Sequence, residues 1–296
     1  MGIIINCLKL TVVLTLFQIA IIYFPYLLAN RGKRKIIKDL ILFKPYDFLL
    51  SGIFLFFIAL IASPFDNMKT PTGHIFSNYM GNWIFAVIAN SYFFILYPYL
   101  LKKQHSRFII APGLQEKYKE YFNSNIPVYV TADTLSNAFA SGFFPANKVI
   151  VIGKSLTENL SKDEQFAILC HEQGHHRAND LLKFYGFMAF ALLCFVIGRH
   201  FFIQFMKYLF PAIDNGLVIG IFGSLYGAVF YCFLFSKLSH KAEYRADNFA
   251  AKYAGAENMI RALQNLNVLT GDLLVKGSIT HPSLENRIAN IRKNYA

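Results

Sequence analysis

The sequence predicts a membrane protein that is mainly α-helical, with about five transmembrane helices and one small α+β domain. Its composition is the first observation, because 55% of the 296 residues are hydrophobic and only 16% are charged, with a mean hydropathy of +0.39. Soluble domains carry about 25% charged residues, so this chain is unusually apolar. The second observation is a series of long apolar runs. The third is a more polar stretch, residues 107–181, that contains short strand patterns.

Residues 1–106 are predicted to form an N-terminal membrane region with three transmembrane helices. The apolar runs cover residues 3–28, 48–63 and 83–101. Basic residues collect after the first run, in residues 31–44, and after the third run, at residues 102–103. By the positive-inside rule these stretches face the cytoplasm, whereas the loop of residues 64–82 lies outside. Because the positive charge follows the first run, we expect a retained span and not a cleaved signal peptide.

The net charge of +12 does not indicate nucleic-acid binding. Basic residues lie at the edges of apolar runs, where they anchor helices, and form no stripe with stacking aromatic residues in the polar parts. The four cysteines show no C-x-x-C spacing, so no disulfide framework is predicted. Cys170 points about 100° away from its neighbour His171 on a helix, which favours a packed thiol over a metal ligand.

Residues 107–181 are predicted to form the first part of a folded domain. The patterns indicate strands at residues 126–131 and 148–152 and a helix at residues 116–122. Between the strands lies a segment of alternating character: Asn137, Ala138, Phe139 and Ala140. This alternation suits an edge strand that pairs with an extended peptide backbone. An ordinary buried hairpin is an equally good interpretation of the same residues.

A capped helix is predicted to carry the motif H-E-x-x-H. Ser161 and Glu164 form a capping box, which satisfies the first free N–H groups of a helix. His171 and His175 are four residues apart and so lie on one helix face, with ring nitrogens able to reach one metal ion. Glu172 lies about 100° round the helix, beside the open side of the metal. This is the arrangement of zinc hydrolases, so we predict one zinc ion per chain with Glu172 as the general base.

Two further apolar runs, residues 184–209 and 217–235, are predicted to form a transmembrane hairpin over residues 182–238. A hairpin returns the chain to the side that it left, so residues 239–296 share a compartment with His171 and form the second part of the domain. Helices are expected in this part at residues 242–254, at residues 256–269 and after Pro282. If the H-E-x-x-H helix continues into the bilayer, the metal lies only about 14 Å from the membrane.

The two histidines require a third donor, because zinc in hydrolases usually takes three protein ligands and a water. Glu243 is the best candidate, since it lies on a helix that is predicted on the same side of the membrane. Asp247 shares its helix face and is expected to accept a hydrogen bond from a ligand histidine and so fix its tautomer. A solvated acidic pair beside Lys241 and Arg245 is the alternative interpretation, and the presence of H-E-x-x-H favours the ligand.

Several spaced motifs occur together in one order. They are Asn-Ala-Phe-Ala at residues 137–140, H-E-x-G-H, an apolar hairpin, Glu-x-x-x-Asp from Glu243, and Thr-His-Pro at residues 280–282. Over residues 107–296 the chain resembles the HtpX and CAAX prenyl protease type 1 family of membrane zinc metalloproteases. The resemblance implies a gluzincin domain with His171, His175 and Glu243 on zinc and Glu172 as the base.

The same resemblance implies roles for His281 and Arg287, which stabilise the oxyanion or hold the zinc carboxylate. From the residues alone, these two are typical of a helix start and of a solvated face. Asp180 matches the extended motif of the family and is expected to support the metal ligands. A salt link to His176 or Lys183 is the simpler structural interpretation of Asp180.

The first hundred residues differ from HtpX-like proteins, which usually have two spans before the catalytic domain where three are predicted here. The chain is also similar to the metalloprotease half of beta-lactam sensor-transducers. The shared features are three spans, a basic first loop and the motif H-E-x-x-H-x-x-x-x-D-L-L. The long hairpin and the Thr-His-Pro motif favour the first family.

These expectations combine into a membrane-embedded zinc endopeptidase of a bacterial inner membrane, with its active site facing the cytoplasm. It is expected to cleave membrane-associated or misfolded proteins near the membrane surface, with a protein or peptide substrate and the lipid bilayer as partners. One alternative is a signalling protease that cleaves a single regulator. Another is a catalytically silent zinc-binding adaptor, which would not need Glu172. A transporter is disfavoured because the predicted spans lack intramembrane acids.

Overall fold

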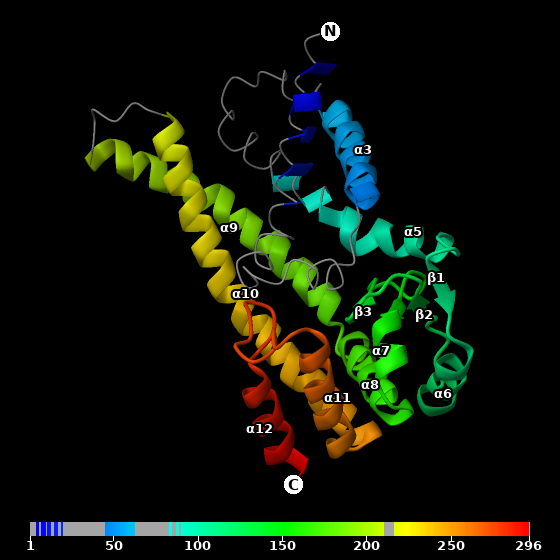
Figure 1. Ribbon diagram of the computed structural model, residues 1–296. Helices are drawn as coiled ribbons and strands as arrows, with labels where there is room; N and C mark the ends of the chain where they lie inside the picture. Colours follow the sequence, from blue (N-terminus) through cyan, green and yellow to red (C-terminus); the bar gives the residue numbers. More distant parts are fainter. Residues whose placement is uncertain are drawn as a thin grey trace.

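The described residues are mainly helical and contain one small mixed sheet, which confirms this part of the predicted fold class (Figure 1). The computed structural model describes residues 4–5, 7–9, 11–12, 15–16, 19, 45–62, 83–84, 87–88, 90–209 and 216–295. The predicted first span, residues 3–28, and the loop of residues 64–82 lie largely outside them. Among the described helices, none combines the length and the apolar character that a membrane crossing requires.

The sheet has the strand order β1-β2-β4-β3. Its strands are β1 (Phe108–Ile110), β2 (Val128–Thr131), β3 (Ala138–Ser141) and β4 (Val149–Ile152). β2 and β4 are parallel at the centre, and each edge strand is antiparallel to its neighbour. β3 pairs with β4, placing Phe139 opposite Val151. β3 is thus both half of a hairpin and an edge strand, so the two interpretations of its alternating pattern describe the same element.

The sequence patterns do not predict two short elements or the correct start of one helix. β1 and α7 (Lys154–Asn159) are too short to show a period, so neither is predicted. α6 (Pro112–Phe122) begins four residues before the predicted helix. Pro112 stands in its first turn, where a missing N–H breaks no hydrogen bond, and it therefore starts the helix instead of excluding it.

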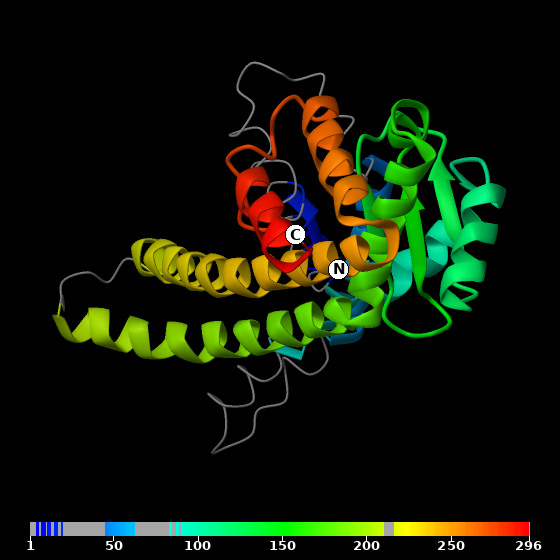
Figure 2. The same cartoon turned by 90° about the horizontal axis from the view of Figure 1, so that it is seen from below.

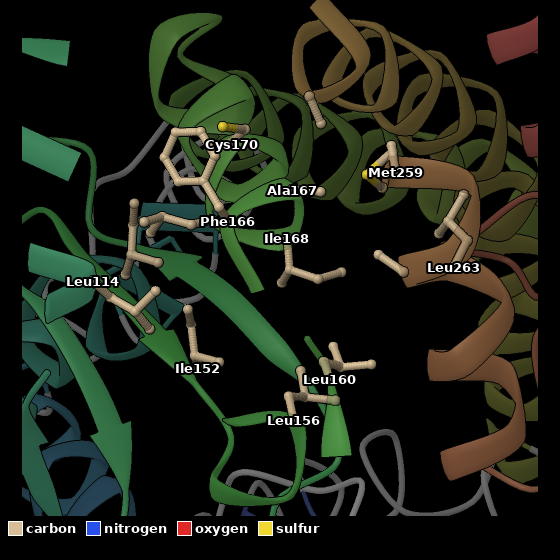
Figure 3. Close-up of a cluster of buried hydrophobic side chains, with 14 of the residues drawn as sticks. Leu114, Ile152, Leu156, Leu160, Phe166, Ala167, Ile168, Cys170, Met259 and Leu263 are labelled. Atoms are coloured by element: carbon tan, nitrogen blue, oxygen red, sulfur yellow. The ribbon is translucent and has the colours of Figure 1, made fainter. Parts of the chain in front are cut away.

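One face of the sheet is covered by α8 (Lys162–Arg177) and, beyond it, by α11 (Ala256–Leu269). Figure 3 shows side chains from α8, such as Ile168, in one cluster with Ile152 of β4 and Met259 of α11. The capping box between Ser161 and Glu164 starts α8 as predicted. Cys170 is packed in this core, and burial raises the pKa of its thiol to about 12, although Lys117 opposes the change. It is a packed thiol.

The other face of the sheet meets the N-terminal elements. η2 (Tyr92–Leu96), α5 (Tyr97–Lys103) and β1 contribute buried side chains that pack against β2 and β4: Tyr92, Tyr97, Leu101 and Phe108 against Tyr129, Val149 and Val151. A buried ion pair ties α3 (Pro45–Ala62) to the start of β1, because Arg107 lies 3.2 Å from Asp47. The N-terminal elements therefore share a core with the sheet.

Two long helices, α9 (Asp180–Leu209) and α10 (Gly216–Ala254), run side by side and project from the domain (Figure 2). They form a helical hairpin where a transmembrane hairpin was predicted, and the rings of Phe184 and Phe235 lie 5.5 Å apart in it; the membrane crossing stays a prediction. Residues 242–254 are helical and end at Ala254 as predicted, but they continue the second helix of the hairpin. α10 continues through this region without a break, since no glycine or proline occurs between residues 228 and 254 to stop it.

The return helix α10 crosses α8 at very close range. A Cβ atom added to Gly174 of α8 would lie 3.0 Å from the Cα of Ala246 and 3.3 Å from the Cβ of Phe249. Glycine is therefore the residue that lets the two backbones approach. After α11, the chain ends in α12 (Leu284–Tyr295), which begins two residues beyond Pro282 and packs on α10 and α11.

Candidate metal centre

Three side chains from α8 and α10 converge where the helices cross. The Nε2 atoms of His171 and His175 lie 3.2 Å apart, and the Glu243 carboxylate lies 3.6 Å from the first and 3.5 Å from the second. A zinc ion with Zn–N distances of about 2.05 Å and tetrahedral angles separates its donors by about 3.3 Å. The three donors are thus spaced to enclose one ion, and together they form a group that could hold a metal.

A carboxylate lies behind each histidine. His171 Nδ1 is 2.9 Å from Asp247, and His175 Nδ1 donates to Asp180 across 3.0 Å. A proton held on Nδ1 leaves the lone pair of Nε2 for a metal. Two imidazole lone pairs and one carboxylate that face one another attract a cation. Two histidines and a carboxylate are a donor set that suits Zn²⁺.

The field at this site strongly favours positive charge. Burial lowers the pKa of His175, but Asp180 and Glu243 more than offset it and raise the pKa to about 10. Burial raises the pKa of Glu243, but the nearby His281 and Arg287 outweigh it and hold the pKa well below its usual range. Glu243 is therefore a charged donor.

Arg287 of α12 joins the two acids of α10. Its guanidinium makes a bidentate contact with Asp247, at 2.8 and 2.6 Å, and lies 3.3 Å from Glu243. The side chain is buried, and burial lowers its pKa, but the two carboxylates outweigh this effect and raise the pKa. Arg287 is thus a fixed positive charge behind the metal ligands, and not the solvated residue that its sequence context suggests.

His281 approaches Glu243 from the loop between α11 and α12, with Nδ1 at 3.1 Å from the carboxylate. Ser239 and His240 of α10 hold this loop through the carbonyls of Thr280, at 2.6 Å, and Ser278, at 2.9 Å. Gly277 turns the loop with φ +67°, and a Cβ atom there would lie 2.6 Å from the nitrogen of Ser283. The side chain of His281 remains 44% exposed, so it can meet a ligand.

A cavity of about 290 Å³ opens beside the three donors. It is lined by His171, Glu172 and His175 of α8, by Asn137, and by Ala138, Phe139 and Ala140 of β3. Glu172 is only 6% exposed and borders the cavity beside the metal-binding atoms. All of the predicted site residues therefore gather round one cavity or directly support the groups that line it.

Arg245 is the site residue that sequence reasoning missed, since it was considered only as a neighbour of a solvated acidic pair. It donates to Asp180, which also bonds to His175 and forms a longer ion pair with Lys183, one of the two partners that the simpler interpretation favours. His176 instead bonds to the carbonyl of Val149, and Lys183 lies 3.9 Å from Asp180. No local pattern indicates the Arg245 contact, because the two residues are 65 positions apart.

The comparisons with known proteins agree with this geometry. Residues 114–295 match the model of peptidase family M48. The chain is 30% identical to protease HtpX of Stutzerimonas stutzeri, over 53% of this chain and 63% of that protein, and 31% identical to protease HtpX of Hahella chejuensis, over 54% and 62%. The matched part thus spans less than two thirds of these relatives.

A similar fold occurs in the crystal structure of Ste24p from S. mikatae. The TM-score is 0.56 at 19% identity, and the match covers 83% of this chain and 64% of that chain. At this identity the likeness concerns the fold alone. The family match covers more than half of the chain, confirms the resemblance drawn from the motifs, and shows that the chain belongs to peptidase family M48, a family of zinc metallopeptidases.

Proposed function

We propose that this chain is a zinc-dependent endopeptidase that holds one zinc ion through His171, His175 and Glu243. The observation that carries the proposal is the spacing of these donors, 3.2 to 3.6 Å, with a carboxylate behind each histidine. A bound zinc ion would supply Lewis-acid polarisation of a scissile carbonyl and would lower the pKa of a water. A silent structural site would not need Glu172, a buried acid that lines the cavity.

Glu172 acts in this proposal as the general base. Its carboxylate takes a proton from the attacking water and returns it to the leaving amine. His281, partly exposed beside Glu243, donates a hydrogen bond to the oxyanion. Arg287 holds the carboxylate of Glu243, the third metal ligand, in place. Asp180 and Asp247 keep the two histidines in the tautomer that faces the metal.

The substrate is an extended peptide that lies along β3. This strand is at the edge of the sheet, where it pairs with β4, and residues 137–140 line the cavity. An added strand gains affinity from backbone hydrogen bonds, and cavities beside the edge strand select side chains. Cleavage would therefore depend on an unfolded or extended segment and not on a folded surface.

We further propose that the enzyme works at a cytoplasmic membrane surface on membrane-associated or misfolded proteins. In this proposal the three-span region of residues 1–106 and the hairpin of residues 182–238 anchor a protease domain made of residues 107–181 and 239–296. The apolar composition supports it, as do the large apolar side chains that α9 exposes: Leu182, Phe190, Ile197, Phe201 and Phe205. Such an exposed apolar face needs a covering, which lipid provides.

The test uses the full chain purified in detergent, with casein and membrane proteins as substrates. We expect cleavage that a chelator stops and zinc restores, and that Glu172→Gln abolishes while zinc binding persists. Glu120→Gln, on the exposed face of α6, is the matched control and should cleave like the parent. Cleavage that persists in Glu172→Gln would remove Glu172 as the base, whereas zinc binding without any cleavage would favour the adaptor.

A further inference from the structure

One helix supplies three groups to the metal centre. α10 carries the metal donor Glu243 and the acid Asp247, which supports His171, and between them it carries Arg245. Positions two apart on a helix point in different directions, so Arg245 leaves the face of the two acids. It reaches instead across the base of the hairpin to Asp180, the first residue of α9.

Asp180 joins two partners through its two oxygens. Oδ2 accepts from Nδ1 of His175 at 3.0 Å, and Oδ1 accepts from Nη2 of Arg245. The acid is 1% exposed, so both of its oxygens are shielded from bulk water. Lys183 approaches Oδ1 only to 3.9 Å, and its side chain is 52% exposed. Arg245 is thus the closest positive charge that holds this buried carboxylate.

We propose that Arg245 is a positioning residue for the metal site, which acts on His175 through Asp180. The carboxylate must lie behind the imidazole to keep the Nε2 lone pair directed at the ion. Arg245 fixes one oxygen of that carboxylate and thereby leaves the other aimed at Nδ1. The role rests on the proposed function, since it concerns zinc bound by His171, His175 and Glu243.

The other histidine shows the same arrangement. His171 is supported by Asp247, which is held in turn by the bidentate guanidinium of Arg287. The site therefore consists of two chains of contacts, each running from arginine to aspartate to histidine. They differ in exposure, because the side chain of Arg287 is 4% exposed and that of Arg245 is 40% exposed. Solvent screens the more exposed pair, so the effect of Arg245 should be the smaller of the two.

The experiment measures zinc affinity and metal geometry in the purified full chain. After chelation, Zn²⁺ is returned in competition with a chromophoric chelator, and Co²⁺ is added separately to record its visible absorption. Arg245→Ala should weaken zinc binding by about tenfold, the lower end of the range for groups that support a metal ligand, and should change the Co²⁺ spectrum. Arg245→Lys should recover part of the loss. Lys183→Ala, which removes a charge near the same oxygen, should behave like the parent.

A double-mutant cycle separates positioning from a general loss of folding. Asp180→Asn removes the intermediate charge, so Arg245→Ala should cost little further affinity in that background. Additive losses in the cycle, or parental zinc affinity and Co²⁺ spectrum in Arg245→Ala, would overturn the role of Arg245 alone. A parent chain that binds no zinc would overturn the proposed function and this role with it.

Discussion

At the scale of single residues, the group that controls His171 is the acid behind it. Asp247 is completely buried 2.9 Å from Nδ1, and the bidentate contact with Arg287 leaves its carboxylate fully paired. Burial raises the pKa of Asp247, but Arg287 and His171 outweigh it, so the pKa is lowered and the acid stays charged at neutral pH. Replacing Asp247 with asparagine, which has the same size and no charge, is therefore a sensitive test of the site.

Asp247→Asn should weaken zinc binding by about 10- to 100-fold, because the amide cannot hold the Nδ1 proton as a carboxylate does. It should also reduce thermal stability, since Arg287 loses one of its two buried negative partners. Chelator competition and thermal unfolding measure the two effects. Asp163→Asn, at a 69% exposed side chain in the first turn of α8, is the control. Equal zinc affinities for the two variants would contradict the role of Asp247.

Which of these residues could be predicted depends on how far apart in sequence their partners lie. His171, His175 and Glu172 lie on one helix, and Glu243 and Asp247 lie one turn apart on another, so helix geometry alone brings each group together. Arg245 and Asp180 meet only because α9 folds back against α10. Sequence spacing contains no information about that contact, and Arg245 was missed for this reason.

At the scale of elements, the site depends on how closely α10 can approach α8. Glu243 lies on α10 and the two histidines lie on α8, so the distance between these metal-binding groups depends on the distance between the two helices. Gly174, inside H-E-Q-G-H, and Ala246, between Glu243 and Ala250, keep the crossing tight. The interior glycine of the motif is therefore part of the metal geometry.

Gly174→Ala should lower both stability and zinc affinity. By helix propensity alone, a Gly→Ala substitution inside a helix would raise the free energy of unfolding by about 1 kcal/mol. At Gly174 the new methyl group meets the backbone of Ala246 at 3.0 Å, so α10 must move away and take Glu243 with it. Gly186→Ala on α9, where nothing lies within 4 Å of the added atom, is the matched control and should be neutral or stabilising. Equal changes in unfolding temperature and zinc affinity for both variants would show that the crossing is not tight.

The loop that carries His281 gives a second test at this scale. Gly277→Ala should reduce the cleavage rate at unchanged zinc affinity, because the added atom strains a backbone at φ +67° and pushes on Ser283, which displaces His281. Gly255→Ala is the matched control, since it has the same kind of strain at φ +93° in the turn between α10 and α11. A parental cleavage rate in Gly277→Ala would argue against any role of His281 in the reaction.

The sequence predicts an element well when the element has a capping signal or keeps its helical periodicity over many residues. The capping box at Ser161 fixed the start of α8, and the period of residues 256–269 gave α11 with its observed bounds. Short β1 offers only three residues, with Ile109 and Ile110 both exposed, so it shows no alternation between a buried and an exposed face. The continuation of α10 through residues 242–254 follows from the lack of glycine and proline between residues 228 and 254, which the predicted boundary at residue 238 obscured.

At the scale of the whole molecule, the metal site joins the segments that lie before and after the hairpin of α9 and α10. His171 and His175 come from before the hairpin, whereas Glu243 and the supporting Arg287 come after it. The sheet and α8 form one body of packed residues, and α10, α11 and α12 close over it. An ion at the crossing would therefore hold together residues that are 72 positions (His171 and Glu243) and 68 positions (His175 and Glu243) apart in the chain.

Zinc should raise the unfolding temperature of the full chain, and a chelator should lower it. A ligand that binds only the folded state stabilises it by about 4 kcal/mol when its free concentration is a thousand times the dissociation constant. Glu243→Gln removes the charged donor from α10 and should abolish most of this response. Glu257→Gln, on the first turn of α11 and away from the site, should keep it. If Glu243→Gln retained the full response to zinc, the ion would be held on α8 alone and would not join the two halves of the domain.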